Sequence, residues 1–62
     1  MEVLNTIEAA AHVHLSKPTL ERLRLTGDGP PYAKLGKAVR YRKADLDAWL
    51  ASHLIHSTSE GA

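Results

Sequence analysis

Residues 16–43 decide the fold, and they read SKPTLERLRLTGDGPPYAKLGKAVRYRK from Ser16 to Lys43. This stretch holds all eight lysines and arginines of the 62-residue chain but only two acidic residues, Glu21 and Asp28, so its formal charge is +6. The rest of the chain has five acidic residues and no lysine or arginine, so the formal net charge of +1 conceals a strongly polarised molecule. A single basic segment of this kind is the electrostatic signature of a protein that binds a polyanion.

A short helix is predicted over residues 17–25. Ser16 is a favourable N-cap residue, and Gly27 lies where the helix has to stop. At about 100° per residue, Leu20 and Leu23 face inward and the charged side chains face outward or lie on the flank.

Another helix is predicted immediately before it, over residues 6–13. Asn5 and Glu8 have the spacing of a capping box, in which the two residues satisfy each other's backbone amides. The connection between the two helices is only His14-Leu15. Two short helices joined by a tight turn, with charge on the outer face of the second, form the helix-turn-helix pattern.

A β-hairpin is predicted over residues 32–42, where apolar and charged residues alternate after a loop rich in glycine and proline. Its two apolar sides meet if Leu35 lies opposite Val39, which requires a three-residue connection over residues 36–38. We therefore expect one apolar face and one cationic face, with Lys37 at the tip. A two-residue turn would instead place a lysine opposite Val39.

A third helix is predicted from about Lys43, with Asp45 as the acidic cap of its first turn. Residues 1–53 are then one domain, and residues 54–62 are a flexible tail. The fold class is mainly α with a small β-hairpin, that is, a winged helix-turn-helix (helix, turn, helix, hairpin wing, helix). The predicted core consists of Ile7, Ala10, Leu20, Leu23, Leu35, Val39, Tyr41, Leu46, Trp49 and Leu50.

Two elements carry the candidate DNA contacts. They are Lys17, Pro18, Thr19, Glu21, Arg22 and Arg24 on the second helix, and Lys34, Lys37, Arg40 and Arg42 on the wing. Arg22 is the best candidate for reading a base, because its guanidinium can bind guanine O6 and N7 together. Glu21 either accepts from a cytosine amino group or repels phosphate, and Arg24 either braces the hairpin or binds phosphate.

These charges also have ordinary explanations. They could form a solvated helix face, and the cations on the hairpin could discourage edge-to-edge aggregation. The confinement of every basic residue to two elements favours DNA contact.

No metal, cofactor or enzymatic activity is expected. The chain has no cysteine, which excludes disulfides and thiolate zinc sites, and its histidines (His12, His14, His53, His56) match no zinc motif in their spacing. No nucleophile, base and orienting group form a catalytic set. No apolar run is long enough to span a membrane and no signal peptide is evident, so a soluble, cytoplasmic protein is expected.

With these motifs in place, residues 4–51 resemble the small winged helix-turn-helix proteins of the AlpA and excisionase type, which are distantly akin to the DNA-binding domain of MerR regulators. The motifs that carry the resemblance are, in order, Glu8-Ala9-Ala10, Leu15-Ser16, Thr19-Leu20, Arg24, Gly27, Gly29-Pro30-Pro31-Tyr32, Lys34-Leu35-Gly36, Val39-Arg40-Tyr41-Arg42 and Asp45-Leu46-Asp47-Ala48-Trp49-Leu50. The chain departs from the family where His14 replaces the usual glycine of the turn, and where Pro18 and Glu21 replace commoner residues.

The resemblance implies that the second helix enters the major groove of double-stranded DNA and that the wing contacts the adjacent backbone or minor groove. It implies a role in phage or mobile-element biology, as a transcriptional regulator or as an excisionase, with an integrase or RNA polymerase as a possible partner. Because one helix and one wing read only a few base pairs, we expect cooperative self-association of several copies on DNA. The alternative function is a protein-binding module whose basic face docks on an acidic partner.

Overall fold

The computed structural model describes residues 2–55 of the chain. Helix α1 (Thr6–His12) begins at the predicted capping box, which is confirmed. The Glu8 amide donates to the Asn5 side-chain oxygen at 2.8 Å, and the Asn5 amide donates to the Glu8 carboxylate at 2.9 Å. Two of the amides left unpaired at a helix start are satisfied in this way.

The turn after α1 is a Schellman motif with a histidine at its left-handed position. The His14 amide donates to the Ala11 carbonyl at 3.1 Å, and the Leu15 amide donates to the Ala10 carbonyl at 2.8 Å. His14 has φ of 60°, a conformation in which a side chain is strained and glycine is usual. The turn is therefore made at a cost in conformational energy.

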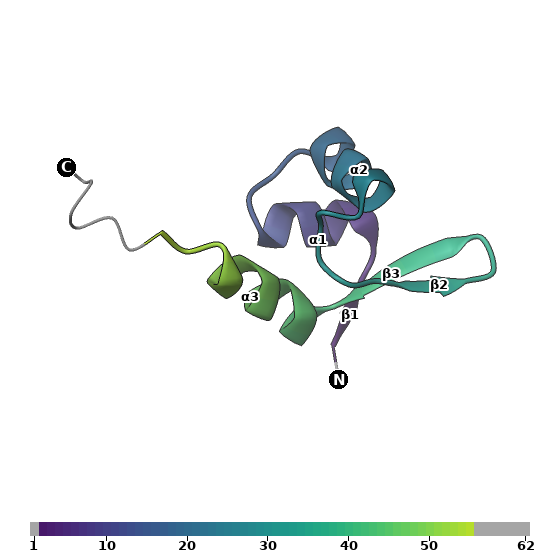
Figure 1. The fold of residues 1–62 in the computed structure, drawn as a ribbon. Coiled ribbons are helices and arrows are strands. Elements are labelled where there is room, and N and C mark those ends of the chain that lie inside the picture. The colour runs from purple at the N-terminus through teal and green to yellow at the C-terminus, as the bar shows by residue number, and fades with distance from the viewer. Residues whose placement is uncertain (1, 56–62) are drawn as a thin grey trace.

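Helix α2 (Lys17–Thr26) follows directly, and it is one residue longer than predicted. Ser16 caps it, as expected, by accepting a hydrogen bond from the Thr19 amide at 3.3 Å. Gly27 ends it with φ of 83°, and the Gly27 amide donates to the Leu23 carbonyl. Helices α1 and α2 thus form the predicted helix-turn-helix (Figure 1).

The hairpin belongs to a three-stranded antiparallel sheet of strand order β1-β3-β2, made of β1 (Val3–Leu4), β2 (Ala33–Leu35) and β3 (Ala38–Arg42). Strand β1, which the sequence analysis did not predict, pairs Leu4 with Tyr41. The beginning of the chain is therefore held against the strand that leads into the last helix.

The predicted register of the hairpin is wrong by one residue. Leu35 lies opposite Ala38, and Lys34 lies opposite Val39, so the connection has two residues, Gly36 and Lys37. Gly36 has φ of 65°, which suits the first central position of a type II′ turn, the kind whose twist matches that of a hairpin. Apolar and cationic side chains consequently share both faces of the hairpin.

The core lies where α1, α2, β3 and the last helix meet. Tyr41, Leu20 and Leu46 are the largest fully buried side chains, and Ala9, Ala10 and Val13 are also buried. Leu4, Leu15, Val39 and Trp49 pack against them in part, and Leu23 is half-buried.

Three residues assigned to the core are exposed: Ile7 (63 %), Leu35 (62 %) and Leu50 (42 %). Ile7 is exposed because the buried stripe of α1 is centred on Ala9 and Val13, about 100° from the predicted stripe. Leu35 lies on the outer face of the hairpin because the turn is shorter than expected. Leu50 is exposed because the last helix buries mainly Leu46, one turn earlier.

Helix α3 (Lys43–Ser52) completes the fold, beginning where predicted. Asp45 does not cap it through a side-chain hydrogen bond, because its carboxylate is paired with Arg42, which occupies the N-cap position.

An aromatic side chain joins α3 to the loop after α2, since the indole of Trp49 donates to the carbonyl of Asp28 at 3.1 Å. His53, expected to be half-buried, is exposed and lies against Trp49 with ring centroids 4.6 Å apart.

A further contact joins α3 to α1. His12 Nε2 lies 2.6 Å from the carboxylate of Asp47, although the two residues are 35 positions apart in sequence. The predicted tail begins with Leu54 and Ile55, which are exposed, and the rest of it lies outside the described residues. None of the helices described over residues 2–55 has the length and apolar character needed to cross a membrane.

Candidate nucleic-acid interface

An open groove separates α2 from the β2–β3 hairpin, and four cations line it. Lys17 and Arg24 come from α2, and Lys37 and Arg40 come from the hairpin. Among the residues that the structure describes, Glu21, also from α2, is the only acidic one that lines the groove. Segments far apart in sequence thus bring positive charge to one place, which is what binding to a polyanionic backbone requires.

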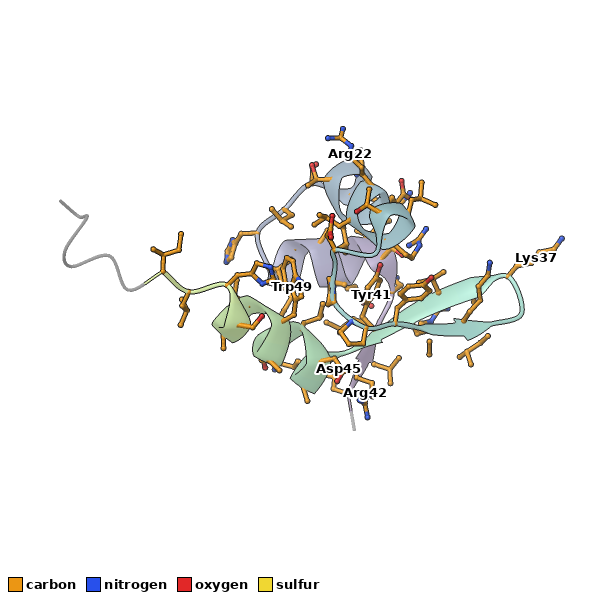
Figure 2. The ribbon with its side chains drawn as sticks, in the orientation of Figure 1. Arg22, Lys37, Tyr41, Arg42, Asp45 and Trp49 are labelled. Carbon is orange, nitrogen blue, oxygen red and sulfur yellow. The ribbon has the colours of Figure 1, made fainter. Side chains whose placement is uncertain are left out.

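Arg22 is exposed on the outer surface of α2, where Figure 2 shows its side chain pointing away from the rest of the molecule. Within residues 2–55, no hydrogen bond or ion pair to its guanidinium is found. Its five donors are therefore available to an external partner, and their planar fork suits a guanine edge or a phosphate.

Lys17 and Glu21 form an ion pair one turn apart on α2, with the Lys17 ammonium 2.9 Å from the Glu21 carboxylate. The hydrogen bond from Lys17 lowers the pKa of Glu21 below its ordinary value, and the charges of Lys17 and Arg24 act in the same direction. Glu21 is consequently a carboxylate at neutral pH, able only to accept hydrogen bonds.

Arg24 braces the hairpin against α2. Its guanidinium donates to the Tyr41 hydroxyl at 3.3 Å and lies 5.7 Å from the centre of the Tyr32 ring. The two tyrosine rings themselves are 6.0 Å apart. Of the two roles left open by the sequence, the structure contains the brace, while Arg24 also lines the groove.

The two wing cations of the groove differ in their surroundings. Lys37 is at the tip of the hairpin, as predicted, and it extends into solvent (Figure 2). Arg40 is partly buried, and one of its guanidinium nitrogens donates to the Val39 carbonyl at 2.8 Å. Lys37 thus brings an exposed charge to the groove at the hairpin tip, and Arg40 brings a charge that a hydrogen bond to the backbone holds in place.

Arg42 and Lys43 lie outside the groove. Arg42 forms two hydrogen bonds with the Asp45 carboxylate, of 2.5 and 2.8 Å, at the start of α3, far from Arg22 in Figure 2. The same carboxylate raises the pKa of the Arg42 guanidinium. Lys43 lies 3.6 Å from a carboxylate oxygen of Glu2. Arg42, a predicted DNA contact, is therefore engaged within the protein and is not grouped with the other candidates.

The remaining predicted contacts are placed less decisively. Pro18 is exposed in the first turn of α2, and the Thr19 hydroxyl lies 2.7 Å from that of Ser16. Lys34 is exposed and shares a face of the hairpin with Val39.

Thr6 and Ile7 line the groove at the start of α1, which the sequence analysis missed because it assigned Ile7 to the core. No sequence signal distinguishes an exposed isoleucine of this kind from a buried one.

The described part of the chain holds no group of three or more histidine, cysteine or acidic side chains that could bind a metal ion. His56, the last of the four histidines, lies outside that part.

The geometry defines a class of protein: a helix-turn-helix followed by a hairpin wing, with a basic groove between the second helix and the wing. The comparison with protein families agrees, because the model described as a helix-turn-helix domain matches residues 3–54. The chain belongs to that helix-turn-helix family, of the AlpA and excisionase type, and membership supports a DNA-binding protein of a typically non-enzymatic family. No curated protein was found to match the chain.

Proposed function

We propose that this protein binds double-stranded DNA in a sequence-specific manner, with α2 in the major groove and the β2–β3 wing on the adjacent backbone or minor groove. It acts on phage or mobile-element DNA as a transcriptional regulator or as an excisionase. One observation carries the proposal: cations from α2 and from the wing converge on one groove, while the guanidinium of Arg22, which has no hydrogen bond or ion pair within residues 2–55, is exposed on the outer surface of α2.

The candidate residues divide into those suited to contact phosphates and those suited to read bases. The groove cations Arg24, Lys37 and Arg40 are suited to phosphates, which set register but carry no sequence information, and Lys17 is suited to a phosphate or to guanine. Arg22 is suited to a base edge, where sequence is read. If the protein contacts four to six phosphates, its affinity for DNA falls about 10²- to 10³-fold as the salt concentration rises from 50 to 200 mM.

Fluorescence anisotropy with labelled genomic fragments at those two salt concentrations tests the proposal. Arg40→Ala is expected to weaken binding to all sequences alike and to reduce the salt slope by about 0.9. Arg22→Ala is expected to reduce the preference for the best fragment over the others. Lys43→Ala is the matched control, since it removes one positive charge outside the groove.

Two results would contradict the proposal. One is binding that is insensitive to salt and to both arginine substitutions. The other is equal weakening by Arg40→Ala and Lys43→Ala, because this would mean that net charge rather than the groove attracts DNA. Capture of an acidic protein in place of DNA would favour the protein-binding module.

Self-association on DNA follows from the small size of the reading surface. One helix and one wing span few base pairs, so we expect several copies to bind side by side on repeated sites. Footprints that extend in steps as protein concentration rises are the expected result, and a single short footprint at every concentration is the opposite one. A promoter reporter and an integrase-dependent excision assay on the footprinted DNA then distinguish a regulator from an excisionase.

A further inference from the structure

The Lys17–Glu21 pair sets a donor and an acceptor side by side on α2. The ammonium and carboxylate are 2.9 Å apart, and both side chains are partly open to solvent, at 49 % and 38 %. Both line the basic groove. A carboxylate in such a place repels every phosphate near it, so it weakens binding to DNA unless it meets a hydrogen-bond donor there.

Few groups in the major groove of DNA can donate a hydrogen bond to the Glu21 carboxylate. Guanine presents only the acceptors N7 and O6, and thymine presents the acceptor O4 and a methyl group. Cytosine and adenine each present an amino group, but adenine also presents the acceptor N7 beside it. Cytosine N4 is therefore the donor that a carboxylate can approach without facing a second acceptor.

The guanine that pairs with this cytosine presents hydrogen-bond acceptors to the Lys17 ammonium. In a C·G pair, cytosine N4 donates to guanine O6 over the usual N–H···O distance of about 2.9 Å. The Lys17–Glu21 pair presents the opposite pattern at the same spacing, acceptor beside donor. In an A·T pair the two acceptors, adenine N7 and thymine O4, lie on opposite sides of the amino group, and O4 is beside a methyl group, whereas guanine offers O6 and N7 side by side.

We propose that Glu21 and Lys17 act as one unit that reads a C·G base pair, with Glu21 accepting from cytosine N4 and Lys17 donating to guanine. This inference rests on the proposed insertion of α2 into the major groove. Glu21 is then a determinant of sequence preference. Its carboxylate weakens the overall affinity for DNA, because it repels phosphate, but it increases the discrimination between base pairs. Arg22, which points away from the rest of the molecule in Figure 2, lies about 100° around α2 from Glu21 and reads a separate position.

Selection from a library of randomised 20-base-pair duplexes, followed by sequencing, tests the inference. The wild-type protein is expected to enrich one C·G position, with discrimination of about 5- to 150-fold against other pairs. Glu21→Gln is expected to shift that position toward A·T, because an amide binds adenine N6 and N7 together. Glu21→Ala is expected to lose the preference there while binding all sequences more tightly.

Lys17→Gln gives a second variant, which is expected to weaken the same C·G preference and no other. Thermal melts of each variant confirm that the fold is kept. Identical base preferences in all four proteins would overturn the inference, and with general tightening by Glu21→Ala they would show that Glu21 only repels phosphate. If the wild type binds the library without preference at any position, the proposed sequence-specific function fails as well.

Discussion

His14→Gly is expected to stabilise the protein, although glycine usually weakens a fold. His14 is held at φ of 60° by the two hydrogen bonds of the Schellman turn. A residue with a Cβ pays about 1–2 kcal/mol in this conformation, and glycine does not. Glycine also gains about 0.5–1 kcal/mol of freedom in the unfolded chain, which opposes the benefit. The net gain in the free energy of unfolding lies between about 0 and 1.5 kcal/mol, with a central value of about 0.5–1 kcal/mol.

Circular dichroism measures this change during thermal unfolding. A gain of 0.5–1 kcal/mol corresponds to a rise of roughly 2–8 °C in Tm for a domain of this size. His14→Ala separates the backbone from the imidazole, since it keeps the Cβ and the strain, and it is expected to leave Tm near that of the wild type.

Gly27→Ala provides the reverse experiment. Gly27 has φ of 83°, and a Cβ added there would meet no atom within 4 Å, so the cost is conformational and not steric. A loss of about 1 kcal/mol is expected. A less stable His14→Gly protein, or an alanine at position 14 that stabilises as much as glycine, would refute the reasoning.

Three other substitutions test separate features. Gly29→Ala would put a Cβ 3.0 Å from the Leu23 Cβ, so a loss of about 1–3 kcal/mol is expected in urea unfolding, and an unchanged midpoint would show that the loop yields freely. Asn5→Ala removes half of the capping box and is expected to cost about 1 kcal/mol in the same assay, with Asn5→Asp close to the wild type. Lys17→Met is expected to raise the pKa of Glu21 toward its ordinary value in an NMR titration, and no change would contradict the assigned cause. Since a lowered carboxyl pKa stabilises the fold above the unfolded-state pKa, this contribution is lost as pH falls through the folded-state pKa of Glu21, and it is smaller in Lys17→Met, where only the charge of Arg24 still lowers that pKa.

The order of helices and the existence of the hairpin could be predicted because each depends on local signals. The Asn5–Glu8 capping box, the Ser16 cap and the stop at Gly27 are all short-range, and all three are present. The alternation over residues 32–42 indicated two strands in the same way. Local chemistry of this kind is written in a few consecutive residues.

Register and burial could not be predicted, because they depend on partners distant in sequence. Apolar matching favoured Leu35 opposite Val39, but the turn geometry available to Gly36 prevailed. Strand β1 has two residues, and it pairs with a strand almost forty positions later, which no local pattern reveals. Ile7 was misassigned for the same reason, since the buried side of α1 is set by what α1 packs against.

A shared cationic flank was predicted from the sequence, but the groove and the set of cations that line it were not. The seven cations of the second helix and the wing were expected on one flank, and four of them, Lys17, Arg24, Lys37 and Arg40, line the groove. Arg42 was excluded by its pairing with Asp45, three residues away, which the sequence analysis assigned to helix capping instead. The pairing with Asp45 thus holds the Arg42 guanidinium at the start of α3, outside the groove.

Trp49 gives this protein an intrinsic spectroscopic probe. It is the single tryptophan of the chain. It lies on α3, away from Arg22 and Lys37 (Figure 2), and its indole donates a hydrogen bond to the Asp28 carbonyl in the loop after α2. Its emission therefore reports whether the α2–β2 loop stays docked on α3, without direct quenching by a ligand in the groove. An emission change during a DNA titration would accordingly signal a rearrangement of the scaffold itself.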